Sequence, residues 1–190
     1  MAFFTRAGTR WWHNAGSLNS LDMENINDKE EAIKKFRELV HDVNICMFTT
    51  LDDHDNLFSR PMSTAKIDEE GNAWFFTNEF SEKIQEVSRD NQVYLIYSHP
   101  GKNIYVNVKG TCTVVLDREK INELWNPLLK AWFPGGKEDP KLCLVKVTTE
   151  EASYWNSNSG KMGVYFKMLR AIAKREKYDE GDVGTLKLGG

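Results

Sequence analysis

The sequence predicts an α+β protein built on a six-stranded antiparallel β-barrel with flanking helices. Three observations support this fold class. Six short apolar stretches have the pattern of strands, polar turns join most of them, and helix-forming segments follow the third and fifth strands. An OB-fold is the closest competing barrel, but helices at these two places do not match it well.

The predicted strands are short and mostly separated by polar turns. They cover residues 43–50, a stretch from Leu57 onward, and residues 73–77, 92–98, 104–116 and 142–147. Pro61 lies within the second strand and cannot donate to a ladder, so it indicates a bulge, a sheet edge or a site of ligand approach. Gly110, in the fifth strand, indicates a bulge or a close backbone approach.

The predicted helices complete the chain. An amphipathic helix over residues 28–41 carries apolar residues at helical spacing, so one face should pack on the barrel. Further helices are expected at residues 81–89, at 117–125 with Asp117 as N-cap, and at 161–174. Asn126 and Pro127 should break the second of these. A short helical turn is expected from Thr149 towards Trp155.

Composition indicates a soluble single-domain protein. The chain has 190 residues, 41% of them hydrophobic and 28% charged, which suffices for a sizeable core. The net charge of −3 gives no general attraction to nucleic acid or anionic membranes, and no apolar run is long enough to cross a bilayer. Any anion site must therefore be local.

Cysteine and histidine usage argues against several common classes of site. The three cysteines are odd in number and lie in apolar stretches, which favours buried thiols in a reducing, cytoplasmic compartment. They are Cys46, Cys112 and Cys143. No Cys or His spacing fits a metal site, and no glycine-rich phosphate loop or nucleophile elbow occurs.

The first 22 residues differ in character from the rest. They contain Arg6 and Arg10, several aromatic residues and, up to Leu21, no acidic residue, without the amphipathic pattern of a transit peptide. We interpret residues 1–22 as a non-native or poorly conforming extension, with Met23 as the natural start. Residues 23–190 would then form a single domain with a C-terminal helix and tail.

The segment 73–83 has the composition of a compact phosphate site. An apolar strand that includes Phe76 and Thr77 leads through a short turn into a helix capped by Ser81, with Lys83 in its first turn. Backbone N–H groups, a hydroxyl and an ammonium would converge on an anion there. The plainer alternative is a capped helix beside a solvated lysine.

A second cluster lies in the strand that begins at Leu57. Arg60 precedes Pro61 and is therefore held extended, which directs a guanidinium able to bind phosphate with two hydrogen bonds. Met62 and Ser63 follow. The alternative is an arginine at an exposed sheet edge, paired with a carboxylate.

The segment 125–136 concentrates aromatic residues beside two glycines. One indole could lie against a planar ligand, with Gly135 and Gly136 allowing close backbone approach, or the aromatic residues could form a core or subunit-interface stripe. Stacking adds about 0.5–1.5 kcal/mol beyond area burial. Hydrogen bonds to charged groups add about 1.5–3 kcal/mol each, so phosphate anchors should dominate affinity.

Taken together, these motifs resemble the FMN-binding split-barrel superfamily (pyridoxamine 5′-phosphate oxidase-like), and most closely its bacterial general stress protein branch. The resemblance runs from Glu31 to Trp155 and more loosely from Gly181 to Leu188. It is carried by the order and spacing of residues 60–62, 76–77 with 81 and 83, 117–118, 125–136 and 154–155.

The resemblance implies a homodimer with FMN, or FAD, at the subunit interface. Arg60, Ser81 and Lys83 would hold the phosphate. The ribityl chain and the edge of the isoalloxazine ring would lie along Arg60, Pro61, Met62 and Ser63. Phe76 and Thr77 would line the same part of the cofactor. Trp132 would reach the cofactor from the partner subunit.

Two departures argue against a true pyridoxamine 5′-phosphate oxidase. Glu82 stands where the oxidase has a second basic residue, and residues 185–190 lack its C-terminal Arg and His. Three functions stay open. They are a flavin-dependent oxidoreductase acting on a small molecule, a flavin-binding stress protein that stores or senses the cofactor, and a cofactor-free dimeric binding module.

Overall fold

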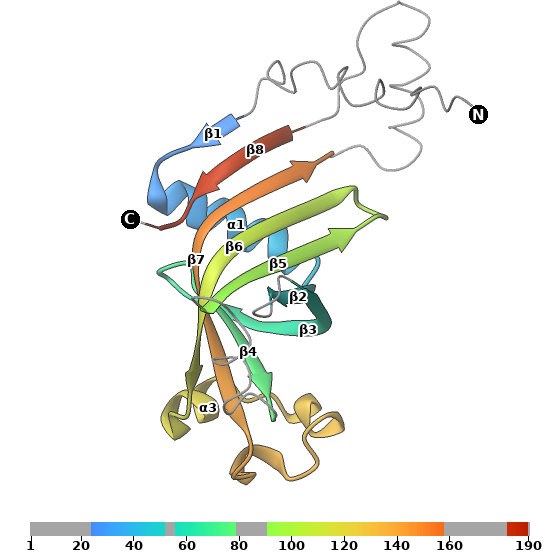
Figure 1. Cartoon of the computed structure of the whole chain (residues 1–190), viewed down its shortest axis with the longest axis vertical. Helices are drawn as coiled ribbons and strands as arrows, with labels where there is room; N and C mark the ends of the chain where they lie inside the picture. The colour runs from blue at the N-terminus through green and yellow to red at the C-terminus, as the bar shows by residue number, and fades with distance from the viewer. Residues whose placement is uncertain (1–23, 52–55, 79–90, 158–181, 190) are drawn as a thin grey trace, which may run out of the picture.

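The structure, a computed structural model, describes residues 24–51, 56–78, 91–157 and 182–189. These residues form one eight-stranded sheet with helices at its two ends (Figure 1). The strands are β1 (Glu24–Ile26), β2 (Ile45–Leu51), β3 (Leu57–Ile67), β4 (Ala73–Thr77), β5 (Gln92–His99), β6 (Ile104–Val115), β7 (Cys143–Asn156) and β8 (Asp182–Lys187). The helices are α1 (Lys29–His41), α3 (Arg118–Leu124) and the 3₁₀ turns η2 (Pro127–Ala131) and η3 (Gly136–Glu138).

Six of the strands close into a barrel. The sheet order is β1-β8-β7-β4-β3-β2-β5-β6, and β6 also pairs with β7. Every pair around the barrel is antiparallel, which confirms the predicted six-stranded fold class. Strands β8 and β1 extend the sheet beyond β7 and pair with each other in parallel. The predicted helices at residues 81–89 and 161–174 and the extension at residues 1–22 lie outside the described residues.

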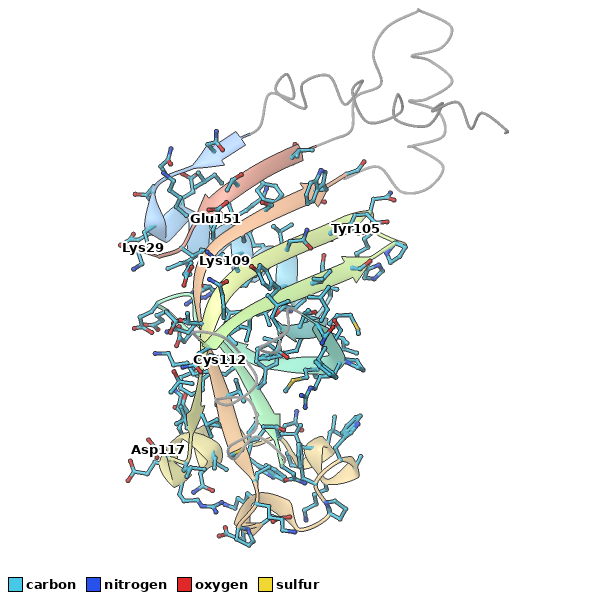
Figure 2. All side chains as sticks on the ribbon, viewed as in Figure 1. Lys29, Tyr105, Lys109, Cys112, Asp117 and Glu151 are labelled. Atoms are coloured by element: carbon cyan, nitrogen blue, oxygen red, sulfur yellow. The ribbon has the colours of Figure 1, made fainter. Side chains whose placement is uncertain are left out.

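The helical turn predicted from Thr149 towards Trp155 is wrong, because β7 continues as a strand to Asn156. Strand β6 pairs with β7 along its whole length, and Figure 2 shows it running from Tyr105 past Cys112 towards α3. The other edge of β7 is shared between β4, over residues 143–147, and β8, over residues 151–156. Pairing with β6 on one edge, and with β4 and then β8 on the other, therefore overrides the local polar sequence.

A bulge in β7 marks the point where its partner changes. The register with β6 shifts between Lys109 and Gly110, and Glu150 is the extra residue. A Cβ at Gly110 would lie 2.5 Å from the carbonyl oxygen of Thr148. Gly110 thus marks both a bulge and a close backbone approach, as its sequence predicted.

Helix α1 covers the end of the main core. Asp28 caps it by accepting a hydrogen bond from the Glu31 amide (2.9 Å), and the helix lies behind β6 and β7 in Figure 1. Its apolar face is buried, as the periodicity predicted. That face consists of Ala32, Ile33, Phe36, Leu39 and Val40. No helix among the described residues is long and apolar enough to span a membrane.

Strand β4 separates two hydrophobic cores. Ala73 and Phe75 pack into the main core, and Phe75 meets Phe48 edge-on with ring centroids 5.5 Å apart. Trp74 and Phe76 point the other way, into a second core beside α3. Burial on both faces explains why this strand is an unbroken apolar run rather than an alternating one.

The turn between β3 and β4 is organised by the buried carboxylate of Asp68. It accepts hydrogen bonds from the Asn72 amide nitrogen (2.8 Å), the Asn72 side chain (2.9 Å) and the Trp74 indole (2.8 Å). Desolvation acts to raise the pKa of Asp68, but the hydrogen bonds from Asn72 and Trp74 outweigh it and lower the pKa below its usual value. The turn is therefore stabilised by the charged form of this group.

We expect Asp68→Asn to lower the free energy of unfolding by about 1–3 kcal/mol at neutral pH, because an amide cannot accept all of these bonds. The folded pKa is depressed, so the stability that Asp68 contributes is present above its unfolded pKa and lost as the pH falls through the folded value. Thermal unfolding measured from about pH 6 to about pH 2 should therefore show that the stability difference between the wild type and Asp68→Asn becomes smaller in acid. Glu138→Gln, at an exposed carboxylate, is the control, and a pH-independent difference would contradict this role.

We expect Gly110→Ala to destabilise the barrel by about 1–3 kcal/mol or more, because the new methyl group would collide with backbone atoms of β7. Gly101→Ala is the matched control. Its methyl group would meet only the His99 ring, at 3.1 Å, which can move aside. Equal denaturant midpoints for the two variants would show that the β6–β7 approach is not a constraint.

Candidate functional site

The site begins where β3 and β4 separate. Strand β2 pairs with β3 from Leu57 to Ser63, but β4 pairs with β3 only from Thr64 to Ile67, with a shift in register between Thr64 and Lys66. The edge of β3 over residues 57–63 therefore faces no described strand. The backbone groups on this edge are left to a ligand, to water or to residues outside the described ranges.

A groove of about 410 Å³ lies at this separation. Its walls come from the β2 entrance, β3, β4 and the segment after α3, and none of its described lining side chains carries a charge. They are Asn44, Pro61, Met62, Ser63, Thr64, Ala65, Phe76, Leu124, Asn126, Leu129, Trp132 and Phe133. Such a lining suits an apolar, uncharged part of a ligand.

Pro61 occupies the open edge, as one of its three sequence interpretations predicted. The Thr64 amide donates to the Asn44 carbonyl (2.7 Å), and hydrogen-bonded pairs alternate along an antiparallel ladder. This alternation turns the Pro61 nitrogen away from β2, so the missing donor costs no ladder bond. The neighbouring Met62 is buried on the opposite face of the strand.

The two tryptophans of the segment 125–136 have different roles. Trp125 meets the Phe76 ring edge-on, with centroids 5.9 Å apart, and packs against the second core. Phe133 is tilted against Phe76 at 6.3 Å and is buried there too. Trp132 is 72% exposed and lines the groove. Trp132 is thus the indole of this segment that is available to a ligand.

The predicted site residues are only partly brought together. Pro61, Met62, Ser63, Phe76 and Trp132 all line the groove, and Trp132 does so within its own chain. Arg60 and Thr77 are the neighbours in sequence of Pro61 and Phe76, and neither is a lining residue. Ser81 and Lys83, the predicted phosphate anchors, lie outside the described residues.

Arg60 and Thr77 lie next to the groove. Arg60 pairs with Phe48 across the β2–β3 ladder and is exposed. Thr77 ends β4, and its carbonyl accepts a hydrogen bond from the Cys143 thiol (3.3 Å). The adjacent Asn78 has a buried Oδ1 atom without a hydrogen-bond partner. This buried acceptor lies one residue beyond Thr77 and is not part of the groove lining.

Several lining residues were not identified from the sequence. Asn126 lies in the segment 125–136 but was interpreted only as a helix breaker. Asn44 stands at the turn before β2 with a positive φ of 26°, a position that only the fold brings to the groove. The other residues not predicted are Thr64, Ala65, Leu124, Leu129 and Phe133.

A buried polar chain supports the β3 wall from behind. The Tyr97 hydroxyl and the Thr64 hydroxyl are hydrogen bonded at 2.8 Å, and Tyr97 also contacts the Cys46 thiol. Burial raises the pKa of Cys46 to about 12 and that of Cys112 to about 11. Both thiols therefore stay protonated near neutral pH, which argues against a nucleophilic role.

No group of three or more His, Cys, Asp or Glu side chains among the described residues could hold a metal ion. All three cysteines are free, and all are buried, as predicted from the apolar stretches in which they lie.

Residues 31–179 match the family model described as "Pyridoxamine 5′-phosphate oxidase like". The chain belongs to this family. A curated relative, the protein bli-3 of Neurospora crassa, is 31% identical over 127 residues, which cover 62% of this chain and 61% of bli-3. The match thus spans less than two thirds of the length of that relative.

Solved structures of general stress proteins have a similar fold. The general stress protein 26 from Jannaschia sp. CCS1 gives a TM-score of 0.65 at 24% identity, covering 84% of this chain and 99% of that one. The general stress FMN/FAD binding protein of Xanthomonas citri gives a TM-score of 0.56 at 28% identity, covering 66% of this chain and 89% of that one. These similarities confirm the resemblance to the bacterial general stress proteins.

Proposed function

We propose that this protein binds a flavin, FMN or alternatively FAD, with the isoalloxazine ring in the groove between β3 and β4. The observation that carries the proposal is the lining of this groove, which is apolar or neutral throughout and includes the exposed indole of Trp132. A planar aromatic ring is the kind of ligand that such walls accommodate. The similarity to a general stress FMN/FAD binding protein supports the same conclusion.

The residues around the groove fit the rest of the cofactor. The open edge of β3 offers backbone groups to the polar edge of the ring. The lining has no charge, so the phosphate must bind beyond it. We assign the phosphate to Arg60, Ser81 and Lys83.

When bound, the flavin would supply electron or hydride transfer, and the chain would bind, orient and shield it. Trp132 would cover the ring and reduce its exposure to water, while Pro61 and Met62 fix its distance from β3. This arrangement suits an oxidoreductase acting on a small molecule. A flavin-storing or sensing protein is the second candidate, because no described residue lining the groove is an evident general base.

We extend the proposal to a homodimer that covers the outer face of β2, β3 and β5. Met47 pairs with Pro61 on one side and with Ile96 on the other, and Met47 and Ile96 are 40% and 42% exposed. Beside them lies a mainly apolar hollow of about 570 Å³ that includes Leu57 and Tyr94. A second copy of the chain would remove this apolar surface from water.

The proposed interface is continuous with the proposed flavin site. Pro61 belongs to both the outer face and the groove lining, so a partner on this face would lie close to the ring. Residues 23–190 would act as one domain in the cytoplasm, where free, buried cysteines are expected.

We expect FMN to bind the wild-type protein and its fluorescence to be quenched on binding. Arg60→Ala and Lys83→Ala should each weaken binding by about tenfold or more, because each removes a positive charge assigned to the phosphate. A tenfold change in Kd corresponds to about 1.4 kcal/mol. Lys34→Ala, at an exposed position of α1, is the control for loss of a positive charge. Unchanged affinity in the first two variants would contradict the phosphate assignment.

The same titration separates the three functions. Colourless wild-type protein that does not quench added FMN would leave the cofactor-free binding module as the remaining candidate. If flavin binds, steady-state NAD(P)H oxidation with electron acceptors distinguishes an oxidoreductase from a storage protein, for which negligible rates are expected.

We expect wild-type protein to have twice the mass of one chain in light scattering, and Ile96→Lys to shift it towards the monomer, because a charge would be buried in the apolar interface. Leu116→Lys is the matched control, since Leu116 is exposed but does not lie on this face. A monomeric wild type, or an unaffected Ile96→Lys dimer, would contradict the proposed interface.

A further inference from the structure

Asn126 occupies a fixed position at the mouth of the groove. It has an extended backbone between α3 and η2, and its Oδ1 accepts a hydrogen bond from the Leu128 amide (3.0 Å). Its backbone carbonyl accepts a second bond, from the Leu129 amide (2.9 Å). Pro127 follows and begins the 3₁₀ turn, so Asn126 is the N-cap of η2.

This capping bond determines which way the side-chain amide faces. The Leu128 N–H can pair only with an oxygen, so the Oδ1 and Nδ2 atoms of Asn126 cannot be exchanged. The NH2 group is the part of the side chain left to meet a ligand, and it carries two donors. Because Asn126 is exposed and lines the groove, the fold presents a donor there whose orientation is set before binding.

The other polar side chains of the lining are placed differently. The Thr64 hydroxyl is already bonded to Tyr97 at 2.8 Å. The Ser63 hydroxyl can donate or accept a hydrogen bond, so it does not discriminate between donor and acceptor atoms of a ligand. Asn44 lies with β2 and β3, on the other wall from Asn126. Asn126 is thus the donor contributed by the segment that also carries Trp132.

We propose that the Asn126 amide is a specificity-determining group, which donates a hydrogen bond to an acceptor atom at the edge of the bound flavin ring. This inference rests on the proposed function. Flavin carbonyl oxygens and ring nitrogens are acceptors, and hydrogen bonds to them tune the electronics of the cofactor. Reduction adds electron density to these atoms, so the Asn126 donor stabilises the reduced flavin more than the oxidised one.

Asn126→Asp is the sharpest test, because aspartate caps a helix as well as asparagine does but replaces the NH2 donor by a charged acceptor. The Kd for FMN should rise about tenfold or more. The midpoint potential of the bound flavin should become more negative, as followed by spectroelectrochemical titration. The melting temperature of the flavin-free protein should stay within about 2 °C of wild type.

Two further variants keep the result interpretable. Asn27→Asp makes the same change of net charge at an exposed position before α1 and should alter neither affinity nor potential. Asn126→Ser retains a capping oxygen but replaces the two donors of the NH2 group by one hydroxyl proton on a shorter side chain, so it should also weaken FMN binding. If Asn126→Asp lowers the melting temperature, the serine variant decides the outcome by its affinity for FMN.

Wild-type affinity and potential in both Asn126 variants would overturn the inference and leave the flavin proposal intact. Failure of the wild-type protein to bind FMN would overturn both, so the two failures are distinguishable. Weaker binding with an unchanged potential would assign Asn126 to general contact with the cofactor and would overturn its role at the ring edge.

Discussion

The early separation of β3 from β4 is the constraint on which the candidate site depends. The two strands share only three residue pairs, between Thr64 and Ile67 on β3, and then diverge. The separation leaves one edge of β3 open and forms a groove between β3 and β4, whose other wall comes from the segment 124–133, distant in sequence. A barrel with full pairing at this point would have no room for a planar ligand.

The walls hold their positions because β4 is packed on both faces. Phe75 belongs to the main core, and Phe76 packs against Trp125 and Phe133 in the second core. Strand β7 supports β4 along its length, and the bulge at Glu150 lets the same strand pair next with β8. A ligand in the groove would thus meet a preformed surface, which reduces the cost of ordering on binding.

Much of the fold could be predicted because its elements have strong local patterns. The amphipathic spacing before His41 identified α1, and the unbroken apolar run from Ala73 to Thr77 matched the bounds of β4. The turn predicted after Thr149 was wrong because local polarity there is outweighed by pairing with β6 and β8. Strand β1 was not anticipated, since its three residues are ordered by a partner more than 150 positions away.

By itself, the sequence determined the barrel class, the family resemblance and four of the β3 and β4 residues that line the groove, which are Pro61, Met62, Ser63 and Phe76. These features depend on local periodicity and on fixed motifs around Pro61 and Phe76. Tertiary structure alone decided that Trp125 packs against the second core while Trp132 lines the groove, and that the Asn126 amide is oriented by its cap. The physical reason is that burial and side-chain direction depend on contacts between distant segments, which no local pattern encodes.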